Sequence, residues 1–341
     1  MPQLLVDTAV LSGHANSLPL AWLEGCKLLA FAPRELTPHT PHAHDADALL
    51  VRTATRVDAA LVAGLPRLRA LATLSSGTDH LDLPALRAHD VGLHTGHGGN
   101  AIAVADWVSW ALARLPLRNR RVLVVGVGAV GSAVAELLAH QGLTPTLCDP
   151  PRSEREADFP PLTLDQALAD GPWGAVTLHV PKAADGPHAT TDLLHRHRLA
   201  QLRGAVVLNA ARGGVLDETA AAALRLDGHL AGLAVDTFVG EPRPRPELLK
   251  AADLATPHIA GHSIEGKLRV AHRAIAGLRR ALELPPSGSL AAAISDVLAG
   301  LGDRDLTPFA ALDAANRALR AEPAQFEAIR HTHRRVEHFL R

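Results

Sequence analysis

The sequence predicts an α/β protein with a doubly wound parallel sheet and a second, smaller, flavodoxin-like α/β domain. Three observations lead to this fold class. Residues 121–150 contain an apolar run, a glycine-rich turn, a helical segment and a second apolar run in succession. Short apolar runs alternate with helical segments before and after this stretch. A chain of 341 residues with 47% hydrophobic content can also bury the cores of two or three domains.

The central stretch predicts a βαβ unit. Val122–Val125 is a short apolar run of the kind that forms a strand buried on both faces. A helix is predicted over Ala129–Gln141 and a second strand over Thr144–Cys148, which ends at Asp149. The acid therefore follows directly at the far end of the unit, where a nucleotide-binding βαβ unit carries one.

The glycines between the first strand and the helix have the spacing G-x-G-x-x-G. Gly126 permits a tight turn, Gly128 lets the backbone approach a pyrophosphate, and Gly131 lets the helix pack closely on the strand. The N–H groups of the helix start bind phosphate charge. Asp149 accepts hydrogen bonds from ribose hydroxyls and repels a 2′-phosphate, which favours NAD over NADP, although Arg152 weakens this preference. We therefore predict an NAD-binding Rossmann domain.

The first 93 residues have the rhythm of a small parallel α/β domain. Two of its apolar runs end in residues suited to an anionic ligand: Arg52 and Thr53 after one run, and Ser75 to Thr78 after another. Ligands of open parallel sheets bind beyond the carboxyl ends of strands, so these groups are candidates for substrate binding. Turn residues without a ligand are the alternative. We predict a substrate domain over residues 1–100 that is completed by residues 258–284.

The remaining chain divides into two further parts. Three apolar runs, Ala175–Val180, Ala205–Asn209 and Leu230–Val235, continue the parallel sheet, so residues 101–257 are predicted to form one Rossmann domain. The amphipathic segment Ser263–Leu284 then returns to the first domain. A Pro-Pro-Ser-Gly linker follows, and residues 285–341 are predicted to form a separate, mostly helical segment.

Composition excludes several classes of function. A formal net charge of -1 provides no general basic field for nucleic acid or membrane, and no long apolar segment predicts a membrane span. The basic end, residues 330–341, is interpreted as a solvated helix face rather than a nucleic-acid site. Cys26 and Cys148 lie far apart and in no metal-binding spacing. We expect a soluble cytoplasmic protein without a metal.

Three predicted strand ends of the Rossmann domain each carry an ionisable residue suited to oxidation of a 2-hydroxy acid. Arg212 can hold a substrate carboxylate with two parallel hydrogen bonds. His258 can take the hydroxyl proton while hydride leaves C2, and Glu241 can fix its tautomer and stabilise its charged form. Asp236 is placed to hydrogen-bond a nicotinamide carboxamide. Taken singly, each of these is as well explained as a turn or surface residue, and the prediction depends on their combination.

These motifs resemble the D-isomer-specific 2-hydroxyacid dehydrogenases. The broad resemblance rests on GVGAVG, NAARGG, DTFVGEP and TPHIAG. A narrower one rests on ADALLVRT, SGTDHLD, GGNAIAVADWV, CDPPR, a DGP insert and HSIEGK, and extends weakly into the tail at EPAQFEAIR. The narrower motifs are similar to those of family members that oxidise a phosphorylated four-carbon acid in vitamin B6 biosynthesis. This resemblance implies that the C-terminal segment is an abbreviated dimerisation domain, and hence a homodimer.

The resemblance also implies roles for individual residues. Arg212, Glu241 and His258 correspond to the active-site residues, and Thr53 and Ser75 to substrate contacts. We also expect Arg52 and His262 to lie near the substrate phosphate. His262 stands where the family usually has Tyr, and it retains a hydrogen-bonding side chain. The cofactor contacts are implied to be Gly126, Gly128, Val130, Gly131, Asp149, His179, Val180, Ala210, Ala211, Asp236 and Gly261.

The expected activity is NAD-dependent oxidation of 4-phospho-D-erythronate to (R)-3-hydroxy-2-oxo-4-phosphobutanoate in pyridoxal 5′-phosphate biosynthesis. A sister dehydrogenase that acts on glycerate, hydroxypyruvate or 3-phosphoglycerate is one alternative. An NAD-sensing binding protein of the same fold is another, because such relatives resemble the enzymes at the same three residues. Turnover on phosphorylated and unphosphorylated acids separates these hypotheses.

Overall fold

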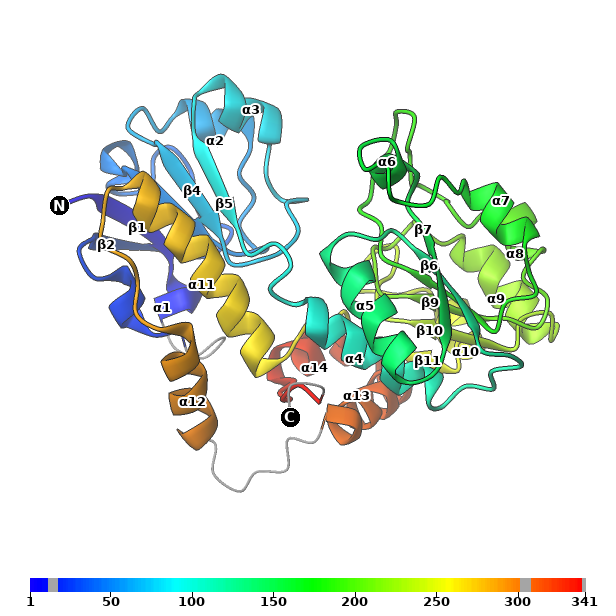
Figure 1. The fold of residues 1–341 in the computed structure, drawn as a ribbon. Coiled ribbons are helices and arrows are strands. Elements are labelled where there is room, and N and C mark those ends of the chain that lie inside the picture. The colour runs from blue at the N-terminus through cyan, green and yellow to red at the C-terminus, as the bar shows by residue number, and fades with distance from the viewer. Residues whose placement is uncertain (12–17, 301–307, 339–341) are drawn as a thin grey trace. The chain divides into compact units, whose positions relative to one another are not determined.

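The computed structural model describes residues 1–11, 18–300 and 308–338, which form two compact α/β units (Figure 1). The first unit comprises the described residues up to Asn100 together with α11 (Ile264–Ala281) and α12 (Leu290–Gly300). The second unit begins at Ala101 and continues to Ser263. It also contains α13 (Pro308–Ala321), η3 (Pro323–Gln325) and α14 (Phe326–Thr332).

The first unit is built on a five-stranded parallel sheet of order β2-β1-β3-β4-β5. Its strands are β1 (Gln3–Asp7), β2 (Lys27–Phe31), β3 (Ala48–Val51), β4 (Ala70–Thr73) and β5 (Gly92–Thr95). The shorter helices are α1 (Thr8–Leu11), η1 (Leu20–Leu23), η2 (Ala43–Asp45), α2 (Ala59–Ala63) and α3 (Leu83–Ala88). All residues of β3 and β4 are buried, and α11 packs against β4 and β5. This strand order is that of the flavodoxin-like fold, which agrees with the fold that we predicted for this domain.

The second unit contains a six-stranded parallel sheet of order β11-β10-β9-β8-β6-β7. Its strands are β6 (Arg121–Val125), β7 (Thr144–Cys148), β8 (Ala175–Leu178), β9 (Val206–Asn209), β10 (Gly232–Val235) and β11 (Leu254–Ala255). Its other helices are α4 (Ala101–Leu112), α5 (Ala129–His140), α6 (Pro150–Ser153), α7 (Leu164–Ala169), α8 (Arg196–Leu199), α9 (Glu218–Leu226) and α10 (Pro246–Ala251).

Alternate side chains of the central strand β6 fill two separate cores. Val122 and Val124 pack with residues of α4 and α5, whereas Leu123 and Val125 pack with residues of α7 and α9. Both faces of the sheet are therefore covered, which explains why the strand reads as an uninterrupted apolar run. The predicted doubly wound Rossmann domain is confirmed, and β7 has the predicted bounds.

The C-terminal residues are shared between the two units. α12 belongs to the first unit, whereas α13 and α14 belong to the second, where Leu319 and Phe326 are fully buried in its cores. The segment from His258 to Ser263, which we predicted to belong to the first domain, also lies in the second unit. Asp236 holds it there by accepting hydrogen bonds from the backbone N–H groups that follow His258.

One prediction about the tail is wrong. We interpreted residues 330–341 as a solvated helix face, but α14 ends at Thr332 and Arg335 is 0% exposed. The basic composition of this stretch misled the prediction because its buried carboxylate partner lies far away in the sequence. Residues 339–341 lie outside the described part of the chain. Among the described residues, no helix is long and apolar enough to cross a membrane.

Candidate active site

The glycine turn after β6 brings three backbone segments into close contact. Gly126 has a φ of +85°, and a Cβ there would lie 2.7 Å from Cγ1 of Val180 and 2.8 Å from the carbonyl carbon of His179. A Cβ on Gly131 would lie 2.0 Å from the carbonyl oxygen of Gly126. By contrast, a Cβ on Gly128 would meet nothing within 4 Å. The first and third glycines are therefore needed by the fold, whereas the second faces open space where a ligand can approach.

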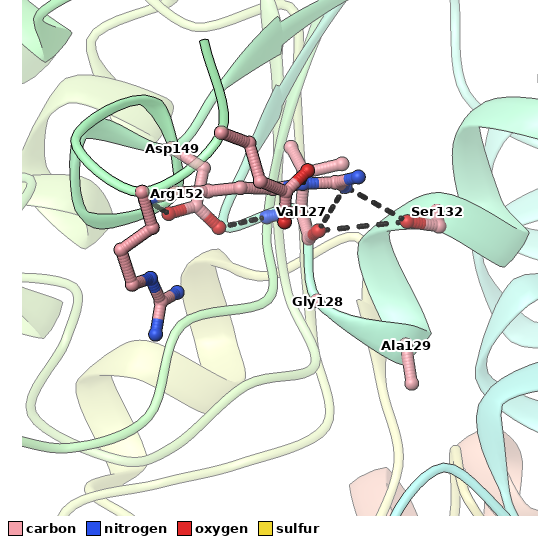
Figure 2. A pocket seen from close by; sticks show the side chains of 8 residues that line it. Val127, Gly128, Ala129, Ser132, Asp149 and Arg152 are labelled. Carbon is pink, nitrogen blue, oxygen red and sulfur yellow. Dashed lines mark hydrogen bonds and ion pairs between the residues drawn. The ribbon is translucent and has the colours of Figure 1, made fainter. Parts of the chain in front are cut away.

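Asp149 lies beside this turn at the end of β7 (Figure 2). Its Oδ2 accepts a hydrogen bond from the N–H of Val127 at 2.7 Å, and its Oδ1 accepts one from the N–H of Arg152 at 3.0 Å. Together with Ser132 and its neighbours, these residues line a cavity of about 310 Å³. The two N–H groups use only part of the hydrogen-bonding capacity of a carboxylate, so Asp149 can also accept from ribose hydroxyls.

Arg152 is engaged by the protein itself. Its Nε lies 2.8 Å from Oε2 of Glu156, its Nη1 donates to the carbonyl of Val127 at 2.8 Å, and its guanidinium stacks 4.6 Å from the ring centre of Phe159. The carboxylate of Glu156 offsets part of the charge of Arg152, and the other two contacts use donors and surface of the guanidinium that a 2′-phosphate would need. This arrangement strengthens the NAD preference that we predicted from Asp149.

The loop after β8 borders the same turn. His179 hydrogen-bonds to the hydroxyl of Thr177 at 2.9 Å, and burial lowers the pKa of His179 to about 3. His179 therefore adds no positive charge beside the glycine turn at neutral pH. Val130, in the first turn of α5, and Val180 are partly buried and pack against the two cores of the second unit. Their predicted contacts with the cofactor stay predictions.

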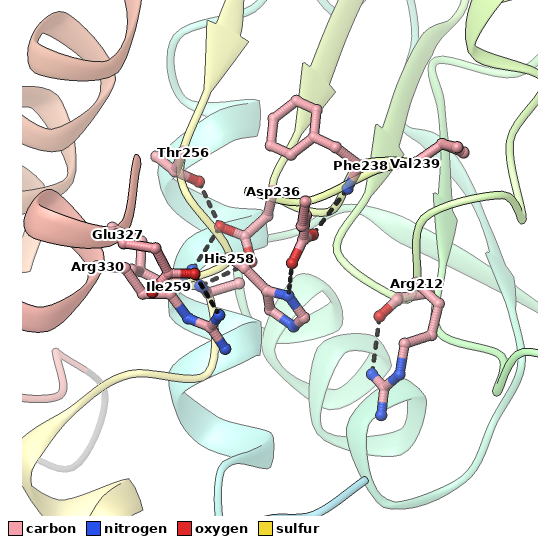
Figure 3. Close-up of polar contacts among 12 residues, drawn as sticks. Arg212, Asp236, Phe238, Val239, Thr256, His258, Ile259, Glu327 and Arg330 are labelled. Carbon is pink, nitrogen blue, oxygen red and sulfur yellow. Dashed lines mark hydrogen bonds and ion pairs between the residues drawn. The ribbon is translucent and has the colours of Figure 1, made fainter. Parts of the chain in front are cut away.

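Glu241 and His258 form a hydrogen-bonded pair at the ends of neighbouring strands β10 and β11 (Figure 3). Nδ1 of His258 lies 2.8 Å from Oε2 of Glu241, and Oε1 of Glu241 accepts the N–H of Phe238 at 2.9 Å. Burial raises the pKa of Glu241, but His258, this N–H group and the charge of Arg330 together outweigh burial and lower the pKa below its usual value. Glu241 is therefore a carboxylate at neutral pH. Its hydrogen bond places the proton of His258 on Nδ1 and leaves the Nε2 lone pair as an acceptor.

The loop that carries His258 is fastened by Asp236. Oδ1 of Asp236 accepts hydrogen bonds from the hydroxyl of Thr256 at 2.6 Å and from the N–H of Ile259 at 2.8 Å. Its Oδ2 accepts the N–H of Ala260 at 2.9 Å. Burial raises the pKa of Asp236, and these three donors with the nearby imidazole oppose the rise. Asp236 thus has a structural role that its position at a strand end did not reveal, and its predicted contact with nicotinamide stays a prediction.

Arg212 lies in the loop after β9, the third neighbouring strand end. A Cβ on the next residue, Gly213, would lie 2.0 Å from the carbonyl oxygen of Phe238, so this loop packs directly against the loop that carries Glu241. Nη1 of Arg212 donates to the carbonyl of Ala211 at 2.9 Å, and the N–H of Ala211 donates to Oδ1 of Asn209 at 3.1 Å. The structure therefore brings the loops of all three predicted catalytic residues to one edge of the sheet.

Three further residues that we predicted to contact the cofactor or the substrate lie in these loops, and their roles stay predictions. Ala210, which directly precedes Ala211, is partly buried beside the core of the second unit. Gly261 and His262 follow Ala260, and the N–H of His262 donates to the carbonyl of Ile259 at 2.8 Å.

The predicted substrate contacts Arg52, Thr53 and Ser75 belong to the first unit. They follow β3 and β4, which are neighbours in its parallel sheet. Nε of Arg52 lies 3.1 Å from Oδ2 of the fully buried Asp7, and Thr53 is exposed. Oγ of Ser75 donates to the carbonyl of Gly77 at 2.7 Å. A guanidinium and two hydroxyls thus gather at one sheet edge of this unit, as an anionic ligand requires.

Sequence reasoning missed the buried groups that hold these side chains. Oγ1 of Thr73 lies 2.9 Å from Oγ of Ser75 and 3.0 Å from Nε2 of His80. Burial lowers the pKa of His80 to about 4, although the charge of Asp79 opposes this shift. The hydrogen-bonded side chains of Ser75, Thr73 and His80 are therefore all uncharged at neutral pH. The buried carboxylate of Asp7 likewise holds the side chain of Arg52. No local sequence pattern distinguishes Asp7 from other acidic residues at strand ends. Within the described residues, no cluster of three His, Cys, Asp or Glu side chains is arranged to hold a metal.

Comparison with known proteins shows which family the second unit resembles. Residues 95–260 match the family described as "D-isomer specific 2-hydroxyacid dehydrogenase, NAD binding domain". This match confirms the resemblance noted in the motifs, and it identifies the matched part of the second unit as similar to an NAD-binding domain. The chain is also 40% identical over 234 residues to erythronate-4-phosphate dehydrogenase of Escherichia coli O81 (strain ED1a). That alignment covers 66% of this chain and 61% of the relative, so the chain spans about three fifths of the relative's length.

Solved structures share the fold. The TT0316 protein from Thermus thermophilus aligns with a TM-score of 0.63 and 25% identity, over 83% of this chain and 98% of that one. An NADPH-dependent glyoxylate/hydroxypyruvate reductase from Sinorhizobium meliloti aligns with a TM-score of 0.67 at 19% identity, over 85% of this chain and 97% of that one. The expectation of two parallel-sheet α/β domains agrees with both likenesses.

Proposed function

We propose that this protein is an NAD-dependent dehydrogenase that oxidises 4-phospho-D-erythronate to (R)-3-hydroxy-2-oxo-4-phosphobutanoate. The observation that carries the proposal is the pair of His258 and Glu241 at 2.8 Å on strand ends of a domain that matches the NAD-binding family model. The substrate is inferred from the 40% identity to erythronate-4-phosphate dehydrogenase of E. coli O81. Pyridoxal 5′-phosphate biosynthesis is the pathway that this substrate implies.

The cofactor site fits NAD on two grounds. Space for a pyrophosphate is open at Gly128, next to the start of α5. Asp149 presents a carboxylate to ribose hydroxyls, while Arg152 is held by Glu156 and Phe159. Bound NAD supplies the acceptor for the hydride that leaves C2 of the substrate. The proposed contacts of the cofactor are those that we predicted from the sequence.

The catalytic roles follow from the chemistry of the three loops. Arg212 binds the substrate carboxylate with its planar guanidinium and thereby fixes which face of C2 is presented. Nε2 of His258 accepts the proton of the C2 hydroxyl, because the hydrogen bond to Glu241 keeps its own proton on Nδ1. Glu241 stabilises the imidazolium that forms. It can do so because its pKa is lowered and it stays ionised.

The substrate phosphate needs cationic and hydroxyl donors. Within the first unit, Arg52 supplies a guanidinium oriented by Asp7, and Thr53 and Ser75 supply hydroxyls. We propose these three residues as phosphate contacts of the first unit, and His262 as a substrate contact of the second unit. We further propose that residues 285–341 support a homodimer, which analytical ultracentrifugation tests. We also propose a cytoplasmic location, because both cysteines are free thiols.

Turnover on a matched panel of acids tests the proposal. NADH formation is measured with 4-phospho-D-erythronate, D-erythronate, D-glycerate and 3-phospho-D-glycerate, each with and without an added 2-oxo acid that can reoxidise tightly held NADH. We expect the highest kcat/KM for the phosphorylated four-carbon acid. A higher value for a three-carbon acid would assign the protein to a sister dehydrogenase. NAD binding without turnover on any of these acids would favour a sensing role.

A further inference from the structure

The segment His333–His338 is largely buried in the second unit although five of its six side chains are charged or titratable. Arg335 and Glu337 are both 0% exposed. Nη2 of Arg335 donates to the carbonyl of Ala103 in α4 at 2.8 Å and to the carbonyl of Ala260 at 2.7 Å. Nη1 of Arg335 lies 3.6 Å from Oδ2 of Asp106, which is also fully buried. One guanidinium therefore joins the C-terminal segment, α4 and the loop that carries His258.

A second contact fastens the same loop further along. Oε1 of Glu337 accepts a hydrogen bond from the hydroxyl of Ser263 at 2.7 Å, and the N–H of His338 donates to Oδ2 of Asp106 at 2.8 Å. The C-terminal segment thus holds the loop at Ala260 and again at Ser263. These two positions lie on either side of Gly261 and His262.

The conformation of the loop explains why it needs such support. His258 has a φ of +55°, which lies in the left-handed region that few residues other than glycine adopt. On its N-terminal side the loop is held through Thr256, whose hydroxyl donates to Asp236 and accepts from the indole N–H of Trp107 at 2.8 Å. On its C-terminal side the N–H of Ala260 binds Asp236 and its carbonyl binds Arg335. The peptide groups beside Ala260 are thus held by charged side chains of opposite sign.

Stability alone does not account for a buried arginine of this kind. Burying a guanidinium and a carboxylate costs desolvation free energy that their attraction often fails to recover, and apolar replacements are commonly neutral or stabilising. A fixed fork of N–H donors is valuable where a backbone carbonyl has to be held in one position. Arg335 holds the carbonyl two residues after the proposed general base.

We propose that Arg335 is a positioning residue for His258, and that the segment His333–His338 fixes the catalytic loop through Arg335 and Glu337. Its kinetic consequence rests on the proposed dehydrogenase function, but its structural consequence does not. When these contacts are removed, the loop between Thr256 and Ser263 keeps its attachment to Asp236 but loses the support on its C-terminal side. The imidazole of His258 then samples orientations in which Nε2 does not face the substrate.

The experiment compares a double variant, Arg335→Met/Asp106→Asn, with the wild type in the full chain. Removing both charges avoids leaving one of them buried without its partner, and the asparagine oxygen can still accept the N–H of His338. The matched control is Arg320→Met. It removes a guanidinium from the same C-terminal region, where Arg320 binds the carbonyl oxygens of Ala252 and Asp253 away from the His258 loop.

Hydrogen exchange of residues 256–263, the dissociation constant for NAD, kcat and KM are measured for each protein. We expect exchange in this loop to be at least about 10-fold faster in the double variant and kcat to fall by about 10-fold, which corresponds to about 1.4 kcal/mol in barrier height. NAD affinity and KM should stay within about twofold, and Arg320→Met should match the wild type. Arg335→Lys, which can reach one carbonyl, should recover part of kcat.

Other results would overturn the proposal. Unchanged loop exchange and unchanged kcat in a folded double variant would show that Arg335 does not position the loop. A parallel loss of stability, NAD affinity and kcat in the double variant and in Arg320→Met would show a merely structural role. If the double variant does not fold, Arg335→Lys is measured in its place. Hydrogen exchange of the loop at the wild-type rate in Arg335→Lys would then contradict the proposal. A wild type that oxidises no hydroxy acid refutes the proposed function, while loop exchange still tests the positioning.

Discussion

Replacing Glu241 with glutamine probes the hydrogen-bonded pair at the centre of the candidate site. Oε1 of Glu241 accepts the N–H of Phe238 at 2.9 Å, and Oε2 accepts Nδ1 of His258 at 2.8 Å. In Glu241→Gln the single amide oxygen has to serve Phe238, because a backbone N–H cannot pair with an NH₂ group. The amide NH₂ then faces Nδ1 of His258. Nδ1 must become the acceptor, which moves the imidazole proton to Nε2.

The size of the effect follows from this change of tautomer. An imidazole with its proton on Nε2 cannot take the proton of the C2 hydroxyl, so the contribution of positioned acid–base catalysis is lost. We expect kcat to fall by about two to four orders of magnitude, or about 3–5 kcal/mol in barrier height. NAD affinity should change little. Glu241 lies at the catalytic loop rather than at the cavity beside Asp149.

The matched control is Glu218→Gln. Oε1 of Glu218 accepts the N–H of Val239 at 2.6 Å, so this residue supports the same loop after β10 but has no described contact with His258. NADH formation is followed by absorbance for the wild type and both variants, with thermal unfolding as the check of folding. Glu241→Gln with a kcat within about fivefold of the wild type would refute the assigned role of the pair. Equal losses in both variants would trace the effect to the loop.

Four further predictions concern two glycines of the glycine turn, the carboxylate of Asp149 and the partly buried His80. Gly131→Ala should destabilise the protein by about 1–3 kcal/mol or more in thermal unfolding, because its Cβ would lie 2.0 Å from a backbone oxygen. Gly128→Ala should unfold like the wild type yet bind NAD at least about 10-fold more weakly. Asp149→Asn should lower the preference for NAD over NADP by about 10-fold in fluorescence titrations, since it removes the repelling charge. Between pH 6.5 and about 4, His80 binds fewer protons in the native than in the unfolded protein. The free energy of unfolding should therefore fall by up to about 3 kcal/mol as the pH drops through this window. In urea unfolding, His80→Gln should flatten this dependence of the free energy of unfolding on pH.

The sequence predicted those features that arise from local pattern. The apolar run at Val122–Val125, the glycine spacing and Asp149 lie close together in the chain, so the βαβ unit and its acid could be recognised directly. The contact of Glu241 with His258 could also be inferred, because both follow strands that lie side by side in a parallel sheet.

Features that depend on distant partners could not be predicted. Arg335 stands in a basic stretch that suggests solvent, and only the fold reveals that Asp106 meets it more than two hundred residues away. Asp7 looks like an ordinary strand-terminating acid until Arg52 is placed beside it. Strand-end position likewise indicated that Asp236 is important, but not that its oxygens hold the loop of His258.

The central claim is that Arg212 and His258 act together on a phosphorylated 2-hydroxy acid. The most direct test is NADH formation from 4-phospho-D-erythronate by the full chain and by Arg212→Ala and His258→Ala, with an added 2-oxo acid. We predict turnover by the wild type, a fall in kcat of about two to four orders of magnitude in His258→Ala, and a large loss of kcat/KM in Arg212→Ala. Near-normal turnover by either folded variant, or no turnover by a wild type that binds NAD, would contradict the claim.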